Sequence, residues 1–239
     1  MDIRALVTGG SRGIGRAVVD RLIDDGYQVV NFDQQPPERL AYGEQYLCVD
    51  VSDEAALCQA LNQALASGPI TRLVNNAGIV RPQPIERVTT DDLRAVMDVN
   101  LTASVLCAQA LMPGMSAAMN GRIVNISSRA ALGKTERIAY ASSKAALHGF
   151  TKALALEAGV HGITVNAVGP GPIATELFTS VNPPGAPATE RILEAIPLRR
   201  MGSPSEVAHI VASLLDTRAG FTTGQVIYVC GGMTVGLAS

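Results

Sequence analysis

The chain has 239 residues, of which 47% are hydrophobic and 17% charged, and its formal net charge at pH 7 is −2. This composition excludes a disordered protein, and the length suits a single α/β domain over residues 1–239 with a substantial core. The small net charge gives no basic patch that would argue for binding of nucleic acid or of an anionic membrane.

The first predicted strand, residues 3–7, leads into the glycine-rich turn Thr8-Gly9-Gly10-Ser11-Arg12-Gly13-Ile14-Gly15. Apolar residues three to four apart follow it and predict a helix. Between a strand and a helix, such a turn lets the backbone approach phosphate, and the helix N–H groups face the anion. We therefore predict a dinucleotide site, with a plain glycine turn as the alternative. Its predicted contacts are Gly9, Ser11, Arg12, Gly13, Ile14 and Gly15.

A second strand, residues 27–32, ends at Asp33, about 20 residues beyond the turn, where an acid binds adenosine ribose hydroxyls. A carboxylate there repels a 2′-phosphate, so Asp33 predicts NAD (NADH) and disfavours NADP. Arg12 pulls the other way, because an arginine in the turn binds that phosphate. We give Asp33 more weight than Arg12 and predict NAD, since the Asp33 carboxylate competes for the position of the ribose hydroxyl itself. A strand-end aspartate that only begins a turn is the alternative.

The third and fourth strands end in further candidate cofactor contacts. Strand 45–51 ends at Asp50-Val51, where an acid can accept from the adenine amino group, although Ser52 or Asp53 capping the next helix is the alternative. The fourth strand runs into Asn75-Asn76-Ala77-Gly78. Amides and small residues at a strand's carboxyl end suit close approach of a cofactor, although turn formation alone also explains them.

Strands and helices alternate along the whole chain, without an internal repeat or a linker that divides domains. The later predicted elements are helices at 54–66, 91–112, 140–159 and 204–215, and strands at 72–74, 122–126, 164–168 and 225–229. Residues 176–201 are proline-rich and irregular, with a short helix near 189–195. This alternation predicts a doubly wound parallel sheet with helices on both faces.

Tyr140 and Lys144 lie four residues apart on a predicted helix and so share one face. A lysine ammonium beside a phenol lowers the tyrosine pKa from about 10, which gives a proton donor and acceptor near neutral pH. Ser128, at the end of a neighbouring strand, is placed to hydrogen-bond the same substrate oxygen. Alone, the spacing also fits an ordinary surface pair; its weight comes from lying downstream of a nucleotide-binding turn.

These residues form an ordered set that covers nearly the full chain. The set is Thr8-Gly9-x-x-x-Gly13-x-Gly15, Asn75-Asn76-Ala77-Gly78, Asn100, Asn125-Ile126-Ser127-Ser128, Tyr140-x-x-x-Lys144 and Pro170-Gly171. It resembles the classical short-chain dehydrogenase/reductase family. The resemblance implies a Rossmann-type sheet of about seven strands and hydride transfer between a nicotinamide and a CH–OH or carbonyl group.

The resemblance also implies a role for each matching residue. Tyr140 is the general acid and base, Ser128 positions the reacting oxygen, and Lys144 binds the nicotinamide ribose and tunes Tyr140. Asn100 holds a water that passes protons from Lys144 to solvent, and Thr175 contacts the carboxamide. The implied cofactor contacts beyond the glycine turn and Asp33 are Asp50, Val51, Asn76, Ala77, Gly78, Tyr140, Lys144, Pro170, Gly171, Ile173 and Thr175.

The choice of serine departs from the family pattern. The family commonly separates the catalytic serine and tyrosine by about 13 positions, which Ser127 satisfies, whereas Ser128 is one short. We choose Ser128, because ungapped alignment of the motif puts the second serine at the strand end, with a shorter loop before Tyr140. Ser127 stays as the alternative.

The predicted function is NAD-dependent oxidation of a small or medium secondary alcohol, or reduction of the ketone. An NADPH-dependent 3-oxoacyl reductase is one alternative, disfavoured by Asp33 and by the lack of an evident basic cluster for an acidic carrier protein. A nucleotide-sensing protein without chemistry is another, disfavoured because a sensor needs no acid/base pair.

A lid over residues 176–201 is expected to cover the active site and to be its most mobile part. The apolar residues expected to line a modest pocket there are Leu177, Phe178, Ile192, Leu193 and Ile196. Arg129 and Arg137 either bind a substrate carboxylate or phosphate, or are solvated surface residues. The family resemblance implies a homotetramer, or a homodimer, formed through the helices at 91–112 and 140–159.

The cysteines and histidines predict no metal or disulfide. Cys48, Cys58, Cys107 and Cys230 form no Cys-x-x-Cys pair and have apolar neighbours, so we expect buried free thiols. No histidine has partners at metal-ligand spacing. With no signal peptide and no apolar run of about 18 residues, the chain is expected to be soluble and cytoplasmic, with no nucleic acid or membrane partner.

Overall fold

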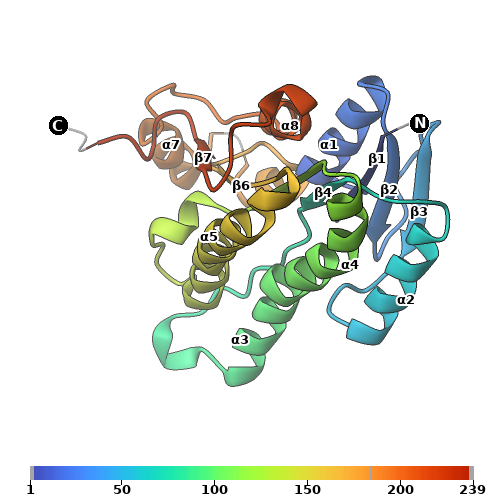
Figure 1. The fold of residues 1–239 in the computed structure, drawn as a ribbon. Helices are drawn as coiled ribbons and strands as arrows, with labels where there is room; N and C mark the ends of the chain where they lie inside the picture. Colours follow the sequence, from blue (N-terminus) through green and yellow to red (C-terminus); the bar gives the residue numbers. More distant parts are fainter. Residues whose placement is uncertain (1–2, 184, 237–239) are drawn as a thin grey trace.

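The computed structural model describes residues 3–183 and 185–236. Within them, seven strands form one parallel sheet in the order β3-β2-β1-β4-β5-β6-β7 (Figure 1). The strands are β1 (Arg4–Thr8), β2 (Gln28–Asp33), β3 (Glu44–Cys48), β4 (Arg72–Asn75), β5 (Gly121–Ile126), β6 (Ile163–Pro170) and β7 (Val226–Val229). The order reverses between β1 and β4, which opens a crevice at the carboxyl ends of these strands. The predicted doubly wound parallel sheet is confirmed.

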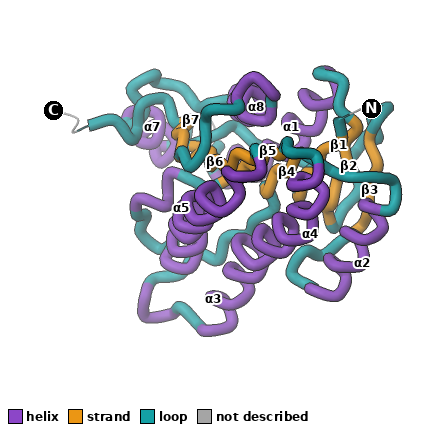
Figure 2. Tube along the Cα trace, in the orientation of Figure 1, coloured by secondary structure: helices purple, strands orange, loops and turns teal. Residues whose placement is uncertain are grey.

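Helices cover both faces of the sheet, as the tube in Figure 2 shows. They are α1 (Gly13–Asp24), α2 (Glu54–Leu65), α3 (Thr90–Met97), α4 (Ala103–Ala117), α5 (Ile138–Ala158), α6 (Glu176–Val181), α7 (Pro187–Glu194) and α8 (Pro204–Leu215). One core lies between the sheet and α2, α4 and α5, and the other between the sheet and α1 and α8.

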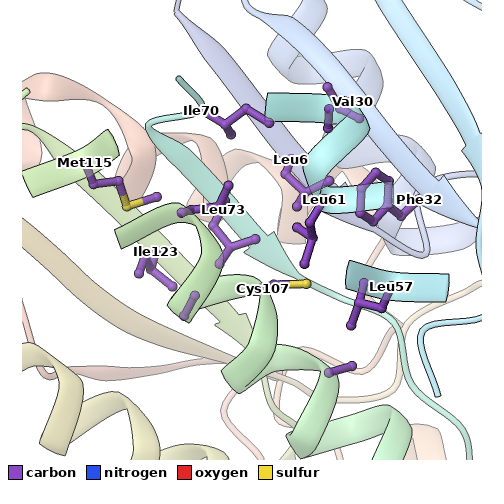
Figure 3. Packing of buried hydrophobic residues seen from close by; sticks show 14 of the residues in the cluster. Leu6, Val30, Phe32, Leu57, Leu61, Ile70, Leu73, Cys107, Met115 and Ile123 are labelled. Atoms are coloured by element: carbon purple, nitrogen blue, oxygen red, sulfur yellow. The ribbon is translucent and has the colours of Figure 1, made fainter. Parts of the chain in front are cut away.

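The central strands β1, β4, β5 and β6 are almost completely buried, because parallel strands covered by helices on both sides have no solvent-facing row. In β1, Leu6 packs into the first core, whereas Ala5 and Val7 pack into the second. Figure 3 shows the first core, where Leu73 of β4 and Cys107 of α4 lie among other fully buried side chains. This packing fixes the strand ends that carry the polar groups described below.

The predicted helix at 91–112 is instead two helices, α3 and α4, joined by a π-helical turn at Asp98–Thr102. Such turns often mark functional positions, and this one contains the fully buried Asn100. Contrary to the sequence expectation, Thr90–Ala117 is long and apolar enough to cross a membrane by length and composition alone. Leu111 and Met115, however, lie in the core beside the sheet, as in the core helix of a globular fold.

Residues 176–201 contain two helices, α6 and α7, rather than the one short helix predicted near 189–195. Pro187 begins α7, where the missing proline N–H leaves no helical hydrogen bond unmade. Pro184, which falls in the predicted lid, lies outside the described residues.

The predicted third strand was too long, because β3 ends at Cys48 rather than at residue 51. All four cysteines are free, as expected, but burial was wrong for two of them. Cys107 and Cys230 are buried, whereas Cys48 and Cys58 are exposed. The reason for Cys48 is that β3 is an edge strand of the sheet.

Candidate functional site

The glycine turn joins β1 to α1 so closely that side chains are excluded from it. Gly9 and Gly13 have φ values of +67° and +56°, a backbone region that favours glycine. A Cβ at Gly15 would lie 1.9 Å from the carbonyl oxygen of Gly9, so the start of α1 touches the turn. Arg12, the N-cap residue, forms no side-chain cap. The first N–H groups of α1 therefore lack a capping side chain and can bind an anion.

The carboxyl end of β4 is fastened to the same turn. Asn76 Nδ2 donates to the carbonyl oxygens of Thr8, at 3.0 Å, and Gly9, at 2.9 Å. In return, Thr8 Oγ1 accepts from the backbone N–H groups of Asn76 and Ala77, each at 3.0 Å. Two motifs 67 residues apart, each weak alone, are thus parts of one site.

A cavity of about 710 Å³ opens at this edge of the sheet, between the turn and the ends of β2 and β4. The predicted cofactor contacts that line it are Gly9, Arg12, Gly13, Ile14, Gly15, Asp33, Val51, Asn76, Ala77, Gly78 and Thr175. Sequence reasoning missed further lining residues, namely Phe32, Gln34, Val49, Ile79, Val99 and Glu176. Most of these directly neighbour a predicted contact, and that adjacency is the signal that could have found them.

Asp33 ends β2 with its carboxylate held by backbone donors. Its Oδ2 accepts from the N–H of Ser11 and its Oδ1 from the N–H of Gln35, each at 3.1 Å. The side chain of Ser11 is buried and accepts from Asn31 Nδ2 at 3.2 Å, so it faces the protein rather than the cavity. Of the two predicted contacts, Asp33 lines the cavity and Ser11 does not.

Asp50 does not line the cavity, because its carboxylate is hydrogen-bonded to the neighbouring Ser52. Its Oδ1 accepts from the N–H and the hydroxyl of Ser52, and these hydrogen bonds lower the pKa of Asp50. Asp53 caps α2 by accepting from the N–H of Ala56 at 3.0 Å. The capping alternative therefore describes this segment, and of the predicted pair only Val51 lines the cavity.

The segment after β6 approaches the cavity mainly through Thr175. Pro170 ends the strand, and the N–H of Gly171 donates to the carbonyl of Val229 in β7. Ile173 is buried in the second core. Thr175 caps α6 and lies next to the glycine turn, since a Cβ on Gly13 would meet its Cγ2 at 3.4 Å.

Lys144 is buried within α5, and no carboxylate contacts it in the described part of the chain. Its Nζ donates to the carbonyl of Ile126 at 2.7 Å and lies 5.8 Å from the ring centroid of Tyr140. Burial lowers the pKa of Lys144 to about 8. A Cβ on Gly78 would come within 3.2 Å of this Nζ and 3.3 Å of Asn100 Oδ1. The glycine therefore leaves room for both groups beside the cavity.

The pKa of Tyr140 is raised, which is opposite to the sequence expectation. Burial is the largest cause, and a hydrogen bond with the Ser128 side chain and the charge of Arg137 offset it in part. The desolvation of the phenol thus outweighs that hydrogen bond and the charge of Arg137. The phenol of Tyr140 is therefore neutral near pH 7.

The two serines after β5 point in different directions, as side chains alternate along extended backbone. Ser127 Oγ is buried, donates to the carbonyl of Lys144 at 2.9 Å and lies 2.8 Å from His148 Nε2. Ser128 accepts from the N–H of Ala130 at 3.1 Å and is the serine that neighbours the Tyr140 hydroxyl. The geometry thus brings the chosen serine, and not its alternative, to the tyrosine.

The side chain of Asn100 forms three hydrogen bonds within the described chain. Its Oδ1 accepts from the N–H of Ile79, and its Nδ2 donates to the carbonyl of Ile79 and to Ser143 Oγ. Ser143 in turn donates to the carbonyl of Tyr140 at 2.8 Å. Asn100 therefore connects the segment after β4 to the first turn of α5.

Among the apolar residues expected to line a lid pocket, the four whose side chains are described, Phe178, Ile192, Leu193 and Ile196, do not line the nucleotide cavity. Ile196 is buried and lines a second cavity of about 250 Å³ beside β7. The side chain of Leu177 lies outside the described ones. Among the described residues, no group of three His, Cys, Asp or Glu side chains could hold a metal ion.

Three cations lie between Ser128 and Tyr140, of which the sequence analysis named two together, Arg129 and Arg137. They are Arg129, Lys134 and Arg137, and within the described ranges none forms an ion pair. Partial burial lowers the pKa of Lys134, and the charges of Arg137 and then Arg129 lower it further. Lys134 therefore lies close enough to both arginines to be repelled by their charges.

Comparison with known proteins extends over almost the full length of the chain. A family model described as enoyl-(acyl carrier protein) reductase matches residues 9–234. An acetoacetyl-CoA reductase of Shinella zoogloeoides is 41% identical, with 95% of this chain and 97% of the relative covered. A 3-oxoacyl-[acyl-carrier-protein] reductase of Synechocystis sp. is 39% identical, with 97% and 96% covered.

Among solved structures, a blue fluorescent protein from a metagenomic library, in complex with NADPH, superposes with a TM-score of 0.86. It is 33% identical, and the match covers 98% of each chain. The comparisons therefore agree with the architecture and with a nucleotide-binding oxidoreductase.

Proposed function

Because the chain belongs to the classical short-chain dehydrogenase/reductase family, we propose that it reduces 3-oxoacyl thioesters with a nicotinamide dinucleotide. The sequence alone favoured a small secondary alcohol or ketone as the substrate, with a 3-oxoacyl substrate as the alternative; we now favour the alternative. The names of the relatives support carrier-linked 3-oxoacyl substrates, acetoacetyl-CoA among them. The observation in this structure that carries the proposal is the cation cluster Arg129, Lys134 and Arg137.

The cation cluster lies on the loop that joins the two groups nearest the reacting oxygen. Arg129 directly follows Ser128, and Arg137 is the residue before α5, three positions before Tyr140. Arg137 Nη1 donates only to a backbone carbonyl, that of the exposed Glu136. Cations held together without a carboxylate partner attract phosphate. A simple alcohol carries no phosphate, whereas coenzyme A does.

The state of Tyr140 supports reduction as the direction. Reduction of a carbonyl needs a proton donor at its oxygen, and a phenol with a raised pKa stays protonated near neutral pH. A bound reduced nicotinamide supplies the hydride. We propose that Tyr140 donates the proton and that Ser128 holds the substrate oxygen. Lys144, with its pKa lowered to about 8, then exchanges a proton near neutral pH and re-protonates Tyr140.

The residues around the cavity fit a dinucleotide, and we propose NAD(H) as the preferred form. The uncapped start of α1 suits the pyrophosphate, and Gly78 leaves room beside Lys144 for the ribose. The NADPH in the metagenomic protein favours the phosphorylated form. Against it, the Asp33 carboxylate lines the cavity and is held in place by two N–H groups. A 2′-phosphate there meets a fixed negative charge.

The test of the substrate compares two thioesters with the same reacting group. We expect acetoacetyl-CoA to be reduced with a kcat/KM at least about tenfold above that of the acetoacetyl thioester of N-acetylcysteamine, which lacks phosphate. Equal efficiencies, together with faster turnover of plain secondary alcohols, would indicate that the substrate is a small secondary alcohol and not a thioester. No turnover of any substrate with either cofactor would identify a non-catalytic nucleotide-binding protein.

The test of the cofactor repeats this assay with NADH and NADPH. We expect NADH to be preferred by at least about tenfold in kcat/KM, which needs about 1.4 kcal/mol of discrimination. Asp33→Asn keeps the shape and removes the charge, so the preference should shrink. Equal or better efficiency of the unmodified protein with NADPH contradicts the proposal for NAD(H).

A further inference from the structure

Behind the glycine turn lies a buried polar network that the nucleotide-binding motif does not include. It consists of Asn31 of β2, Glu44 at the start of β3 and Arg16 of α1. Asn31 is completely buried, the Glu44 side chain has no exposed area, and the Arg16 side chain is 18% exposed. Buried polar and charged groups are costly unless they are paired. Three of them meeting at one place therefore need an explanation.

Asn31 uses its side-chain amide to hold the turn from behind. Its Oδ1 accepts from the N–H of Gly10 at 3.0 Å, and its Nδ2 donates to Ser11 Oγ at 3.2 Å and to Glu44 Oε1 at 2.9 Å. A Cβ on Gly10 would lie 2.5 Å from Asn31 Oδ1, so the turn rests directly on this amide. The position of Asn31 thus sets the position of the turn.

Glu44 connects Asn31 to the helix that follows the turn. Both of its carboxylate oxygens accept from Arg16 Nη1 at 3.0 Å, and Oε2 also accepts from the N–H of Ala41 at 3.1 Å. Arg16 also pairs with the exposed Asp20 of its own helix. Among the described residues, Arg16 is the cation that contacts the enclosed Glu44 carboxylate. Without it, a negative charge would remain next to the phosphate-binding turn.

We propose that Asn31, Glu44 and Arg16 are positioning residues for the dinucleotide, which hold the phosphate-binding turn in its binding conformation before the ligand arrives. In addition, Arg16 neutralises the Glu44 carboxylate, which would otherwise repel the pyrophosphate. A preformed turn lowers the entropy that binding must offset. The inference rests on nucleotide binding, and not on the proposed thioester substrate.

The first test measures NADH binding alone by titration calorimetry, with NADPH in a second series. Arg16→Met leaves Glu44 without its counterion, so we expect the Kd to rise at least about tenfold. Arg16→Met/Glu44→Gln removes that charge and should recover most of the affinity. The control is Arg21→Met on the same helix, whose ion pair with Asp25 is exposed, and its Kd should not change.

The second test separates positioning from stability. Asn31→Ala removes the support of Gly10 and Ser11, whereas Asn166→Ala removes an equally buried amide that bonds only Thr222 and Gln225. Both variants should unfold at lower temperature. Only Asn31→Ala should raise the Kd and the KM for the cofactor, with kcat at saturating cofactor nearly unchanged.

Several results would overturn the inference. They are an unchanged Kd in folded Arg16→Met, no recovery in the double variant, or equal effects of Asn31→Ala and Asn166→Ala.

If Arg16→Met does not fold, Arg16→Lys and Glu44→Gln replace it. Each should bind within about threefold of the parent, because neither leaves an unpaired buried carboxylate. A larger loss in both would contradict the charge argument. None of these measurements uses a thioester, so failure of the proposed substrate would not affect them.

Discussion

Tyr140 and Ser128 come from different elements, α5 and the end of β5, and their side chains are hydrogen-bonded neighbours. Exchanging the tyrosine for phenylalanine keeps the ring and removes the transferable proton. We therefore expect Tyr140→Phe to lose at least about 100-fold in kcat. Calorimetry should show nearly unchanged NADH binding. A variant that keeps most of its turnover would assign the proton donor elsewhere.

Lys144 predicts a particular pH dependence of stability. Its folded pKa, about 8, lies below the ordinary value of 10.5, so the folded state binds fewer protons than the unfolded state between these values. Burying the charged form costs stability below about pH 8, and the cost is relieved as the pH rises toward 10.5. Lys144→Met should thus gain about 1–2 kcal/mol of unfolding free energy at pH 7.

The gain of Lys144→Met should shrink in urea unfolding at pH 10, where the parent lysine is largely neutral in the folded state. Lys152→Met, at an exposed position of the same helix, is the control and should show no such trend. A gain that is constant from pH 7 to pH 10 would mean that Lys144 is not destabilised by its burial.

The cation cluster predicts a change in KM without a change in chemistry. Arg137→Gln should raise the KM for acetoacetyl-CoA about tenfold, because a charged hydrogen bond to phosphate contributes about 1.5–3 kcal/mol. The KM for the N-acetylcysteamine thioester should stay the same. Arg94→Gln, an exposed arginine of α3, serves as the control. Equal changes with both thioesters would show that Arg137 acts on the acyl end or on Tyr140.

At the scale of elements, the predicted lid, residues 176–201, contains α6 and α7. Thr175 caps α6 at the edge of the cavity, and Glu176 lines it. Ordering of this segment on the ligand should slow its amide hydrogen exchange when NADH and a thioester are bound. Peptides covering 176–194 report this, with β5 peptides as the control. Equal protection in the free protein would argue against a lid.

The alternation of apolar runs and glycine turns was sufficient to predict the order of strands and helices. Local patterns did not reveal where continuous helices change geometry. The π-helical turn at Asp98–Thr102 is invisible to them, because it depends on the contacts of Asn100 with Ile79 and Ser143. The end of β3 was misplaced for a similar reason, since pairing with β2 stops at Cys48.

The site was predictable where backbone motifs build it and less so where side-chain packing decides. The glycine turn and the Asn76 segment were found from spacing alone. The raised pKa of Tyr140 depends on burial, which the spacing of Tyr140 and Lys144 does not contain. Arg129 and Arg137 were named from the sequence, but adding Lys134 to them required the fold of their loop. The support of the turn by Asn31 required the sheet.

At the scale of the whole molecule, α5 presents apolar side chains that the described chain leaves uncovered. Leu156 is 83% exposed, and Val160, just beyond the helix, is 76% exposed. We propose that this surface contributes to the homotetramer, or homodimer, that the family resemblance implies. Leu156→Glu should shift the mass measured by light scattering toward smaller species. An unchanged mass, or a parent that is already monomeric, would contradict this.

As a whole, we propose that the molecule is a nucleotide-binding catalyst in which Tyr140 protonates a carrier-linked 3-oxo group. The most direct measurement is the oxidation of NADH by the purified protein on addition of acetoacetyl-CoA, followed at saturating concentrations of both. We expect turnover that depends on the thioester and is lost in Tyr140→Phe. Absence of thioester-dependent oxidation with NADH and with NADPH, while a plain secondary alcohol is oxidised with NAD, would contradict it.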